Sequence, residues 1–371
     1  MNRKYASKFS VGIMATAIGL FGVVAAPLSV QAASAPKLVK HAEPEINIVE
    51  AGSIPGRLSV YVALYNRLFQ KYGLDVHLLE GSSGTQAASL LSGGAAQFEA
   101  GQVSDALNQV VAGVPITAVA SMSNRLSNSM IVSPTLQSAL KSRGLAALAN
   151  VPIGITGVGS GTWEYAELLA KQANLSTSQI NLIPIGANQV TVYQDFISGR
   201  VKGLVFGDPV DLRITGTGKA VWAADEQNIL HGVTKKYPTL VKMSKEPYIF
   251  DWCFTTTSYA NAHPVIVQDF ANAIIAAQNY ILHHSAAKIG AELAQNNPSF
   301  SAFGTGYLTE SVKRMVASGA IVPSVIPTLA GFNNAVTYQA VTDAAIGKIP
   351  YSQVVNPSFA IKAKKLVGNK F

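Results

Sequence analysis

The sequence predicts an α/β protein with two similar lobes and a cleft between them. The main observation is an internal repeat, because residues 45–105 and 151–211 show the same order of apolar and helix-like segments. The glycines that close these segments are spaced by 29, 12 and 8 residues in the first copy and by 29, 13 and 8 in the second: Gly52, Gly81, Gly93, Gly101, and Gly157, Gly186, Gly199, Gly207. Each copy therefore has the pattern strand–helix–strand–helix–strand, which is typical of a parallel sheet covered by helices.

The first lobe is expected to begin near Glu43 with a strand at residues 46–49. Ser53 and Pro55 are typical of the start of the helix that follows. Its apolar stripe has helical spacing and consists of Leu58, Val62, Tyr65 and Phe69. The remaining expected segments of this lobe are a strand at 74–79, a helix opening at 82–85, a strand at 95–100 and a strand at 116–120.

The second lobe is expected to start with residues 130–132 and to contain the second copy. A strong amphipathic helix begins at Pro264, with Ile266, Phe270, Ile274, Ala277 and Ile281 on one face. We predict that this helix returns the chain to the first lobe. The expected boundaries are 43–122 with 257–371 for the first lobe, 130–250 for the second, and 123–129 and 251–256 for the hinge crossings.

The N-terminal segment has the features of a secretory signal peptide. Arg3, Lys4 and Lys8 precede an uncharged stretch, residues 9–30, and Val30-Gln31-Ala32 fits the small-residue rule for cleavage. We therefore expect residues 1–32 to be removed and the mature protein to be periplasmic. An uncleaved membrane anchor is the alternative, because the uncharged stretch is long enough to span a bilayer.

Charge and cysteine content exclude several classes of function. Without residues 1–32 the chain has 25 basic and 20 acidic residues, and no stripe of Lys and Arg with interleaved aromatics suggests nucleic-acid binding. Cys253 is the only cysteine, so an internal disulfide and two-cysteine zinc motifs are impossible. We expect no metal, no cofactor and no catalytic residue. The six histidines show no spacing typical of a metal site or catalytic triad: His41, His77, His231, His263, His283 and His284.

Small polar residues follow the predicted strand ends, where ligands bind in open parallel sheets. They place hydroxyl and amide groups beside free backbone N–H donors at helix N-termini, a combination that suits an anion. For each of them the alternative is a helix cap with no ligand. The candidate ligand-binding residues of this kind are Ser53, Ser83, Gly84, Thr85, Ser160, Gly161, Thr162 and Asn188.

Three further candidates lie beside these termini. Gln102 and Asp208, at the ends of the third strands, can hydrogen-bond a ligand or cap the next helix. Trp163 can either stack on a ligand or pack between helix and sheet. Arg57 could reach an anion, but solvent exposure is the commoner state of arginine. The glycine-rich loop at residues 157–162 lacks the third glycine and the later acidic residue of a dinucleotide site, so a nucleotide is not expected.

The order of several short motifs resembles that of a known superfamily. They are Gly84-Thr85-Gln86-Ala87-Ala88-Ser89-Leu90-Leu91-Ser92-Gly93, Ile153-Gly154-Ile155, Gly159-Ser160-Gly161-Thr162, Phe196-Ile197-Ser198-Gly199, Phe206-Gly207-Asp208-Pro209 and Ala262-His263-Pro264. Over residues 43–285 the chain resembles the solute-binding proteins of ABC importers in the nitrate, sulfonate, taurine and thiamine-precursor superfamily. The resemblance implies a type II periplasmic binding fold, with two Rossmann-like lobes, a ligand cleft, two crossing segments and hinge closure.

The resemblance also implies a function. We expect a monomer that captures a small organic anion, such as a sulfonate or carboxylate, and delivers it to an ABC permease in the inner membrane. One alternative is an enzyme resembling the fungal thiamine-pyrimidine synthases, which use a cysteine-rich segment with histidine and iron. The single cysteine and the predicted export argue against it. Another is a sensory binding protein that presents its ligand to a receptor.

Overall fold

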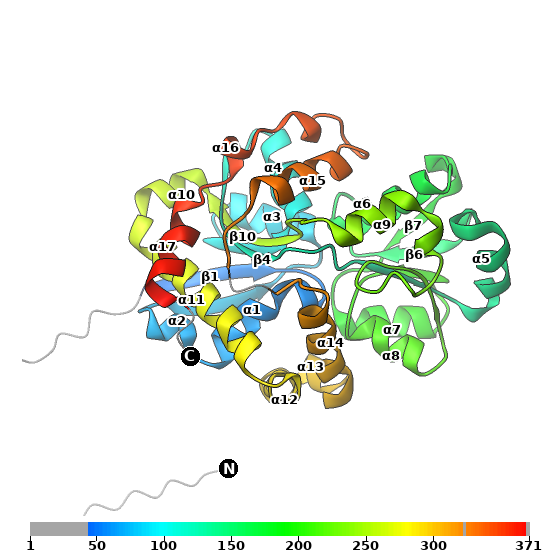
Figure 1. Ribbon diagram of the computed structural model, residues 1–371, viewed down its shortest axis with the longest axis horizontal. Coiled ribbons are helices and arrows are strands. Elements are labelled where there is room, and N and C mark those ends of the chain that lie inside the picture. The colour runs from blue at the N-terminus through cyan, green and yellow to red at the C-terminus, as the bar shows by residue number, and fades with distance from the viewer. Residues whose placement is uncertain (1–43, 322–323, 369–371) are drawn as a thin grey trace, which may run out of the picture. The chain divides into compact units, whose positions relative to one another are not determined.

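Two five-stranded sheets form the framework of the computed structural model, which describes residues 44–321 and 324–368 (Figure 1). The first sheet has the order β2 (Asp75–Glu80), β1 (Glu45–Glu50), β3 (Phe98–Gln102), β10 (Asp251–Thr256) and β4 (Ile116–Ser123). The second has the order β7 (Asn181–Pro184), β6 (Pro152–Ile155), β8 (Gly203–Val205), β5 (Ser129–Val132) and β9 (Val221–Asp225).

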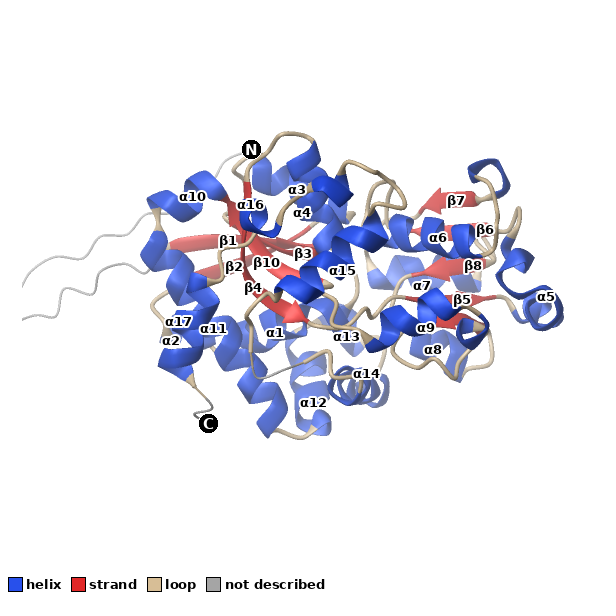
Figure 2. Cartoon of the chain, turned by 45° about the horizontal axis from the view of Figure 1, so that its top comes forward, coloured by secondary structure: helices blue, strands red, loops and turns tan. Residues whose placement is uncertain are grey.

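The two sheets have the same topology. In each, the first three strands of the order come from one copy of the repeat and run parallel. The fourth strand, β10 or β5, runs antiparallel to both of its neighbours. Figure 2 shows the two sets of strands as separate sheets. The predicted two-lobed α/β fold is confirmed, and we call each sheet with the helices that pack on it the first and the second lobe.

Helices connect the strands as the repeat predicts. In the first lobe these are α1 (Ile54–Tyr65), α2 (Leu68–Lys71), α3 (Gly84–Ser92) and α4 (Val103–Val111). In the second they are α5 (Gln137–Arg143), α6 (Gly161–Gln172), α7 (Gln189–Ile197), α8 (Val210–Gly216) and α9 (Pro238–Lys245). The short 3₁₀ segments are η1 (Pro134–Leu136), η2 (Gly144–Leu148), η3 (Thr177–Gln179), η4 (Thr234–Lys236) and η5 (Ile346–Lys348).

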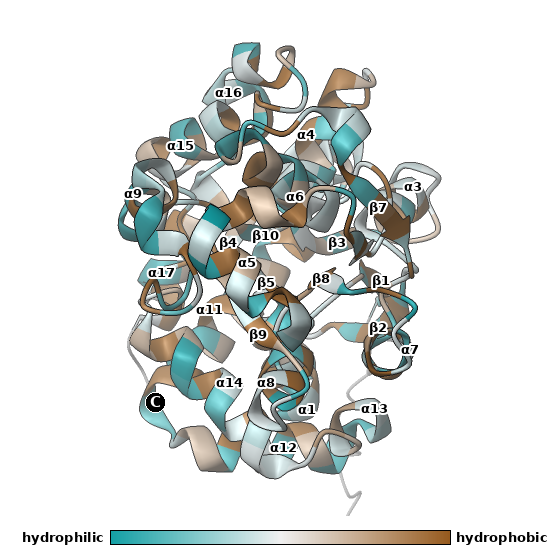
Figure 3. Ribbon diagram, turned by 90° about the vertical axis from the view of Figure 1, so that its right-hand side faces the viewer, coloured by the Kyte–Doolittle hydropathy of each residue, from teal (hydrophilic) through white to brown (hydrophobic). Residues whose placement is uncertain are grey.

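The chain after β10 is helical. Its helices are α10 (Thr257–Ala262), α11 (Pro264–His283), α12 (Ala286–Asn296), α13 (Pro298–Ser301), α14 (Thr305–Ala317), α15 (Leu329–Gln339), α16 (Tyr351–Val354) and α17 (Ser358–Val367). α11 packs against α1 and α17, and α12 packs against α1 and α14. α14 carries both hydrophilic and hydrophobic residues, as expected for a helix with one covered face (Figure 3). These contacts return the chain to the first lobe.

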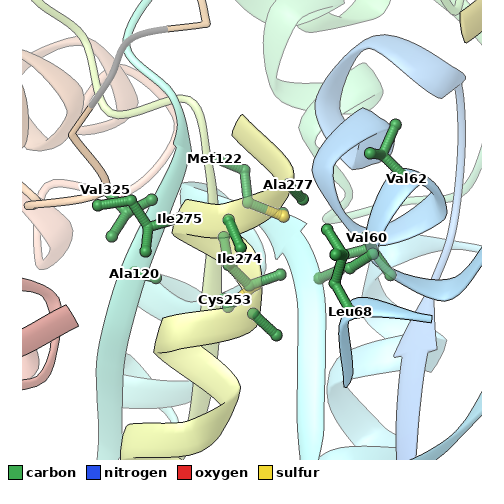
Figure 4. Close-up of a cluster of buried hydrophobic side chains, with 14 of the residues drawn as sticks. Val60, Val62, Leu68, Ala120, Met122, Cys253, Ile274, Ile275, Ala277 and Val325 are labelled. Atoms are coloured by element: carbon green, nitrogen blue, oxygen red, sulfur yellow. The ribbon is translucent and has the colours of Figure 1, made fainter. Parts of the chain in front are cut away.

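The core of the first lobe lies between its sheet and α11. Ile274 and Ile275 of α11 are fully buried beside Met122 of β4 and Cys253 of β10 (Figure 4). The aromatic rings of Phe98 and Phe270 stack with their centroids 3.9 Å apart. Burying side chains of this size contributes about 1.5–3 kcal/mol each, so this layer fixes the sheet on which the candidate site is built.

One predicted hinge crossing is wrong. The chain leaves the first sheet after Ser123 and enters the second at Ser129, close to the expected first crossing. Residues 251–256, expected as the second crossing, instead form β10 within the first sheet. Backbone bonds from Tyr248 to Asn124 and from Phe250 to Ser123 place the two connecting segments side by side, so the return passage precedes Asp251.

Two observations concern membranes and export. Within residues 44–321 and 324–368, no helix combines the length and apolar character that crossing a bilayer requires. The predicted signal peptide, residues 1–32, lies outside the described residues.

Candidate functional site

Two cavities lie where the carboxyl ends of the strands from both sheets face each other. The larger, which we call the chamber, has a volume of about 300 Å³. It is lined from the first lobe by Glu50, Ala51, Gly52, Tyr61, Glu80, Gly81, Ser82 and Gln86, from the second by Ile185, Gly186, Ala187, Asn188, Gln189 and Thr191, and from the segment at α13 by Asn297, Ser299 and Phe300. The position fits the rule that ligands bind beyond strand ends in open α/β sheets.

The smaller cavity, which we call the junction, adjoins the chamber. It has a volume of only about 10 Å³ and shares Ala51 and Gly52 with the chamber. Its other lining residues are Ser53, Arg57, Gly84, Gln102, Asp105, Thr156, Ser160, Gly161, Thr162 and Phe206. The N-termini of α1, α3 and α6 therefore converge here from both lobes.

The structure brings most of the predicted site residues together. Six of them line the junction: Ser53, Gly84, Gln102, Ser160, Gly161 and Thr162. Asn188 lines the chamber. Ser83 and Thr85 lie at the contact between the lobes, because Thr85 Oγ1 donates to the carbonyl of Val158 at 2.9 Å.

The remaining two predicted residues point elsewhere. Trp163 is half-buried and packs on a hydrophobic cluster that contains residues of both lobes, and it lines neither the chamber nor the junction. Asp208 is fully buried, and its Oδ2 lies 3.1 Å from Nε of Arg314. Packing and ion pairing therefore account for these two side chains.

Helix capping occupies several of the predicted ligand groups. Ser83 accepts a hydrogen bond from the N–H of Gln86 at 3.1 Å, and Asn188 accepts one from the N–H of Thr191 at 3.1 Å. Thr162 Oγ1 accepts the N–H of Thr156 at 2.9 Å and lies 2.9 Å from the hydroxyl of Ser160. Ser53 precedes α1 without capping it through its side chain, so its hydroxyl is available to a ligand.

Close contacts hold the two lobes together around the junction. A Cβ at Gly161 would lie 1.3 Å from Oε1 of Gln102 on the other lobe. Asn108 on α4 donates through Nδ2 to the carbonyl of Gly159 and to Oε1 of Glu164, at 3.0 Å each. Only a glycine at position 161 allows this approach, and the lobes are therefore closed at this point.

Buried charges surround Arg57. The expectation that this arginine is solvated is wrong, since it is only 2 % exposed. Its Nη1 donates to Oδ1 of Asp251 at 2.9 Å, and its Nε lies 3.8 Å from Oε2 of Glu50. Burial raises the pKa of Asp251 to about 7 and that of Asp105 to about 6, while Arg57 opposes both shifts. Acidic groups therefore outnumber the single cation here.

A histidine–carboxylate pair also departs from expectation. His231 Nδ1 lies 2.7 Å from Oδ2 of Asp225, although the sequence shows no such pairing. At the surface, Glu45, Asp75 and His77 have ligand atoms within 4.8 Å of one another. This group lies at the amino ends of β1 and β2, opposite to the strand ends that form the chamber.

The residues missed by the sequence analysis are the buried charges and the chamber wall. Glu50 is the last residue of β1, two residues before Gly52, so its position at a strand end was a usable signal. Asp105 follows Gln102 at capping-box spacing and accepts the N–H of Gln102 at 3.0 Å. The contact of Asp251 with Arg57 could not be predicted from neighbouring residues, because it depends on the pairing of β10 with strands that are distant in sequence.

Comparison with solved structures supports the fold. A Bordetella bronchiseptica protein is 19% identical and has a TM-score of 0.76, over 88% of this chain and 98% of that one. The alkanesulfonate-binding protein SsuA of Xanthomonas axonopodis pv. citri, bound to MOPS, is 19% identical with a TM-score of 0.61, over 87% and 99%. The periplasmic nitrate-binding protein NrtA of Synechocystis is 10% identical with a TM-score of 0.66, over 87% and 89%. The chain thus shares the fold of periplasmic binding proteins.

A family model gives the sequence-level assignment. No curated protein matches the chain in sequence. The model described as NMT1/THI5 like matches residues 55–287, which include α1 from its second residue, both copies of the repeat after β1, and α11. This match covers more than half of the chain, and the protein belongs to the NMT1/THI5-like family.

Proposed function

We propose that this protein is the solute-binding component of an ABC importer and that it captures a small organic anion by closing its two lobes. The family, the two-lobed fold and the cavities at facing strand ends support this function. The mature chain, from about residue 33, would act in the periplasm as a monomer. It would pass its solute to a permease in the inner membrane.

The main support for the proposal is the set of groups that line the junction. Backbone N–H groups at the starts of α1, α3 and α6 converge there, and Arg57 is the only basic side chain among its lining residues. Helix N-termini favour a carboxylate or sulfonate. Arg57 is paired with Asp251, and its charge favours an anion only when the neighbouring carboxyls, whose pKa burial raises, are protonated. Hydrogen bonds to such a charged group are each worth about 1.5–3 kcal/mol.

Closure follows from the position of these groups. α1 and α3 belong to the first lobe, and α6 belongs to the second. An anion bound by these helix termini makes all of its contacts only when both lobes face it. Because the junction has a volume of only about 10 Å³, the lobes would close slightly less far around the anion than they do in this structure. A ligand shifts a conformational equilibrium by its difference in affinity for the two states, so this anion would favour the closed state.

A thermal-shift and scattering experiment tests the proposal. The protein lacking residues 1–32 is screened with alkanesulfonates, taurine, nitrate, aromatic carboxylates and thiamine pyrimidines. A cognate ligand at about 100 times its dissociation constant should add about 2.7 kcal/mol of stability and should reduce the radius of gyration. If no compound stabilises the protein or reduces its radius, the proposal is contradicted.

Ser53→Ala locates the ligand. The Ser53 hydroxyl lines the junction but does not cap α1, so its loss should weaken binding about tenfold. The unfolding midpoint without ligand should change little. Ser138→Ala, on the exposed face of α5, is the matched control and should leave both quantities unchanged. Equal affinity of both variants would exclude the junction as the site.

A further inference from the structure

The chamber has acidic walls. Among the seventeen described residues that line it, Glu50 and Glu80 are carboxylic acids and none is Lys, Arg or His. The remaining polar groups are amides and hydroxyls, and the amides are Gln86, Asn188, Gln189 and Asn297. An anion alone would find no positive side chain among these lining residues, which makes the chamber chemically different from the junction.

Glu50, in the wall of the chamber, has a carboxylate oxygen without a hydrogen-bond donor. It is only 4 % exposed, and its Oε1 accepts a hydrogen bond from the hydroxyl of Tyr61 at 2.7 Å. Its Oε2 is buried without a hydrogen-bond donor. The nearest guanidinium atom, Nε of Arg57, is 3.8 Å away, and Arg57 donates its hydrogen bond to Asp251. A buried oxygen in this state is costly unless a donor is supplied.

Glu80, on the neighbouring strand, adds a second carboxylate to the chamber wall. Glu50 and Glu80 are register partners at the ends of the parallel strands β1 and β2. Burial raises the pKa of Glu50 to about 7, Arg57 opposes this shift, and repulsion from Glu80 adds to it. A positive group between the two carboxylates would relieve this repulsion and would give Oε2 of Glu50 its donor.

The second lobe adds another free acceptor. Gln189, the first residue of α7, is 5 % exposed, and its Oε1 is buried without a donor. It lines the chamber from the second lobe, whereas Glu50 and Glu80 line it from the first. Acceptors from both lobes thus surround a space of about 300 Å³, roughly the volume of ten water molecules.

We propose that the solute carries a protonated amine and that the chamber binds this ammonium group through Glu50 and Glu80, with Gln189 as a further acceptor. The inference rests on the proposed function and extends it. Because the chamber and the junction share Ala51 and Gly52, an acidic group of the same solute can reach the junction while its ammonium occupies the chamber.

Pairs of compounds that differ only in the amine test this proposal. Calorimetry on the protein lacking residues 1–32 compares β-alanine with propionate and γ-aminobutyrate with butyrate. An ammonium held by two carboxylates should give the amino compound an advantage of about tenfold or more, equivalent to about 1.4 kcal/mol. Glu80→Gln is the main variant, since its exposed side chain makes misfolding improbable, and Glu50→Gln is the second.

Each outcome decides between the two proposals. The amine advantage should fall at least threefold in Glu80→Gln and in Glu50→Gln. It should persist in Glu45→Gln, which alters an exposed carboxylate at the other end of β1. If the acids without an amine bind as tightly as the amino acids, or if the advantage survives in both variants, the ammonium site is refuted while the proposed function stands. If neither series binds, the ammonium site is refuted, and the proposed function fails as well only if the sulfonates, nitrate and thiamine pyrimidines of the screen also leave the protein unstabilised.

Discussion

Arg314 on α14 donates through Nη2 to both carboxylate oxygens of Asp225, at 3.0 and 2.9 Å. Its Nε also lies 3.1 Å from Oδ2 of Asp208, although not aligned for a hydrogen bond. α14 packs on α12 and α1 of the first lobe, whereas the two aspartates follow β8 and end β9 in the second sheet. This ion-pair cluster therefore links the lobes at a place separate from the junction.

Arg314→Met should destabilise the protein by about 3 kcal/mol or more, because it leaves two buried carboxylates without their guanidinium. Denaturant unfolding measures this loss. Lys313→Met is the matched control, since Lys313 makes only an exposed ion pair with Glu310 at 3.6 Å. It should cost less than about 0.5 kcal/mol. Equal stability of the two variants would show that the buried cluster does not hold the lobes.

Gly157→Ala should hold the lobes apart without disturbing either of them. A Cβ at Gly157 would lie 2.8 Å from Cβ of Ser83 on the other lobe, and this distance is too short for two carbon atoms that are not bonded to each other. We expect a larger radius of gyration by small-angle scattering and weaker solute binding. Gly306→Ala is the control, because an added Cβ there meets no described atom within 4 Å. An unchanged radius in Gly157→Ala would contradict the tight contact.

The fold was predictable because its signals are local. Glycines at strand ends and apolar stripes at helical spacing repeat in both copies, so each strand–helix unit could be recognised from a short window. β10 was not recognised as a strand of the first sheet, because it pairs with β3 and β4, which lie far away in sequence. Trp252 in this strand is fully buried against Phe332 of α15. Nothing near residue 252 indicates that contact.

The candidate site was predictable only in part, for the same reason. Because they follow predicted strand ends, Ser53, Gln102 and Ser160 were predicted as site residues, and all three line the junction. The burial of Arg57 depends on Glu50 and Asp251, which approach it only in the folded protein. Trp163 follows a predicted loop, but the direction of its side chain depends on the rotation of α6 against the sheet. Sequence periodicity in one short helix does not fix that rotation.

The free energy of unfolding should fall as the pH rises from about 5 to about 8, because several buried carboxyls are protonated in the native state. Burial raises the pKa of Asp105 to about 6, that of Glu50 to about 7 and that of Glu164 to about 8. In the unfolded chain these groups ionise near pH 4, so the folded state binds more protons across this interval. Their stabilisation is complete below about pH 4 and is lost through each native pKa.

Urea unfolding of the ligand-free protein at several pH values checks this slope. Glu164→Gln should make the dependence shallower above about pH 6, because the amide cannot ionise. Glu45→Gln alters an exposed carboxylate and should leave the slope as it is. A free energy of unfolding that rises with pH over this range would contradict the protonated state of the buried carboxyls.

Asn108→Ala should loosen the closed state at the start of α6. Its Nδ2 supplies hydrogen bonds to Gly159 and Glu164 from the opposite lobe, and each bond contributes about 1 kcal/mol. Losing them leaves the Glu164 carboxyl buried without this donor, so the open state gains population. We expect faster amide hydrogen exchange over residues 159–163 and a larger radius of gyration. Gln109→Ala, the next residue on α4, should change neither. If exchange in the loop is the same in both variants, the Asn108 bonds do not contribute to closure.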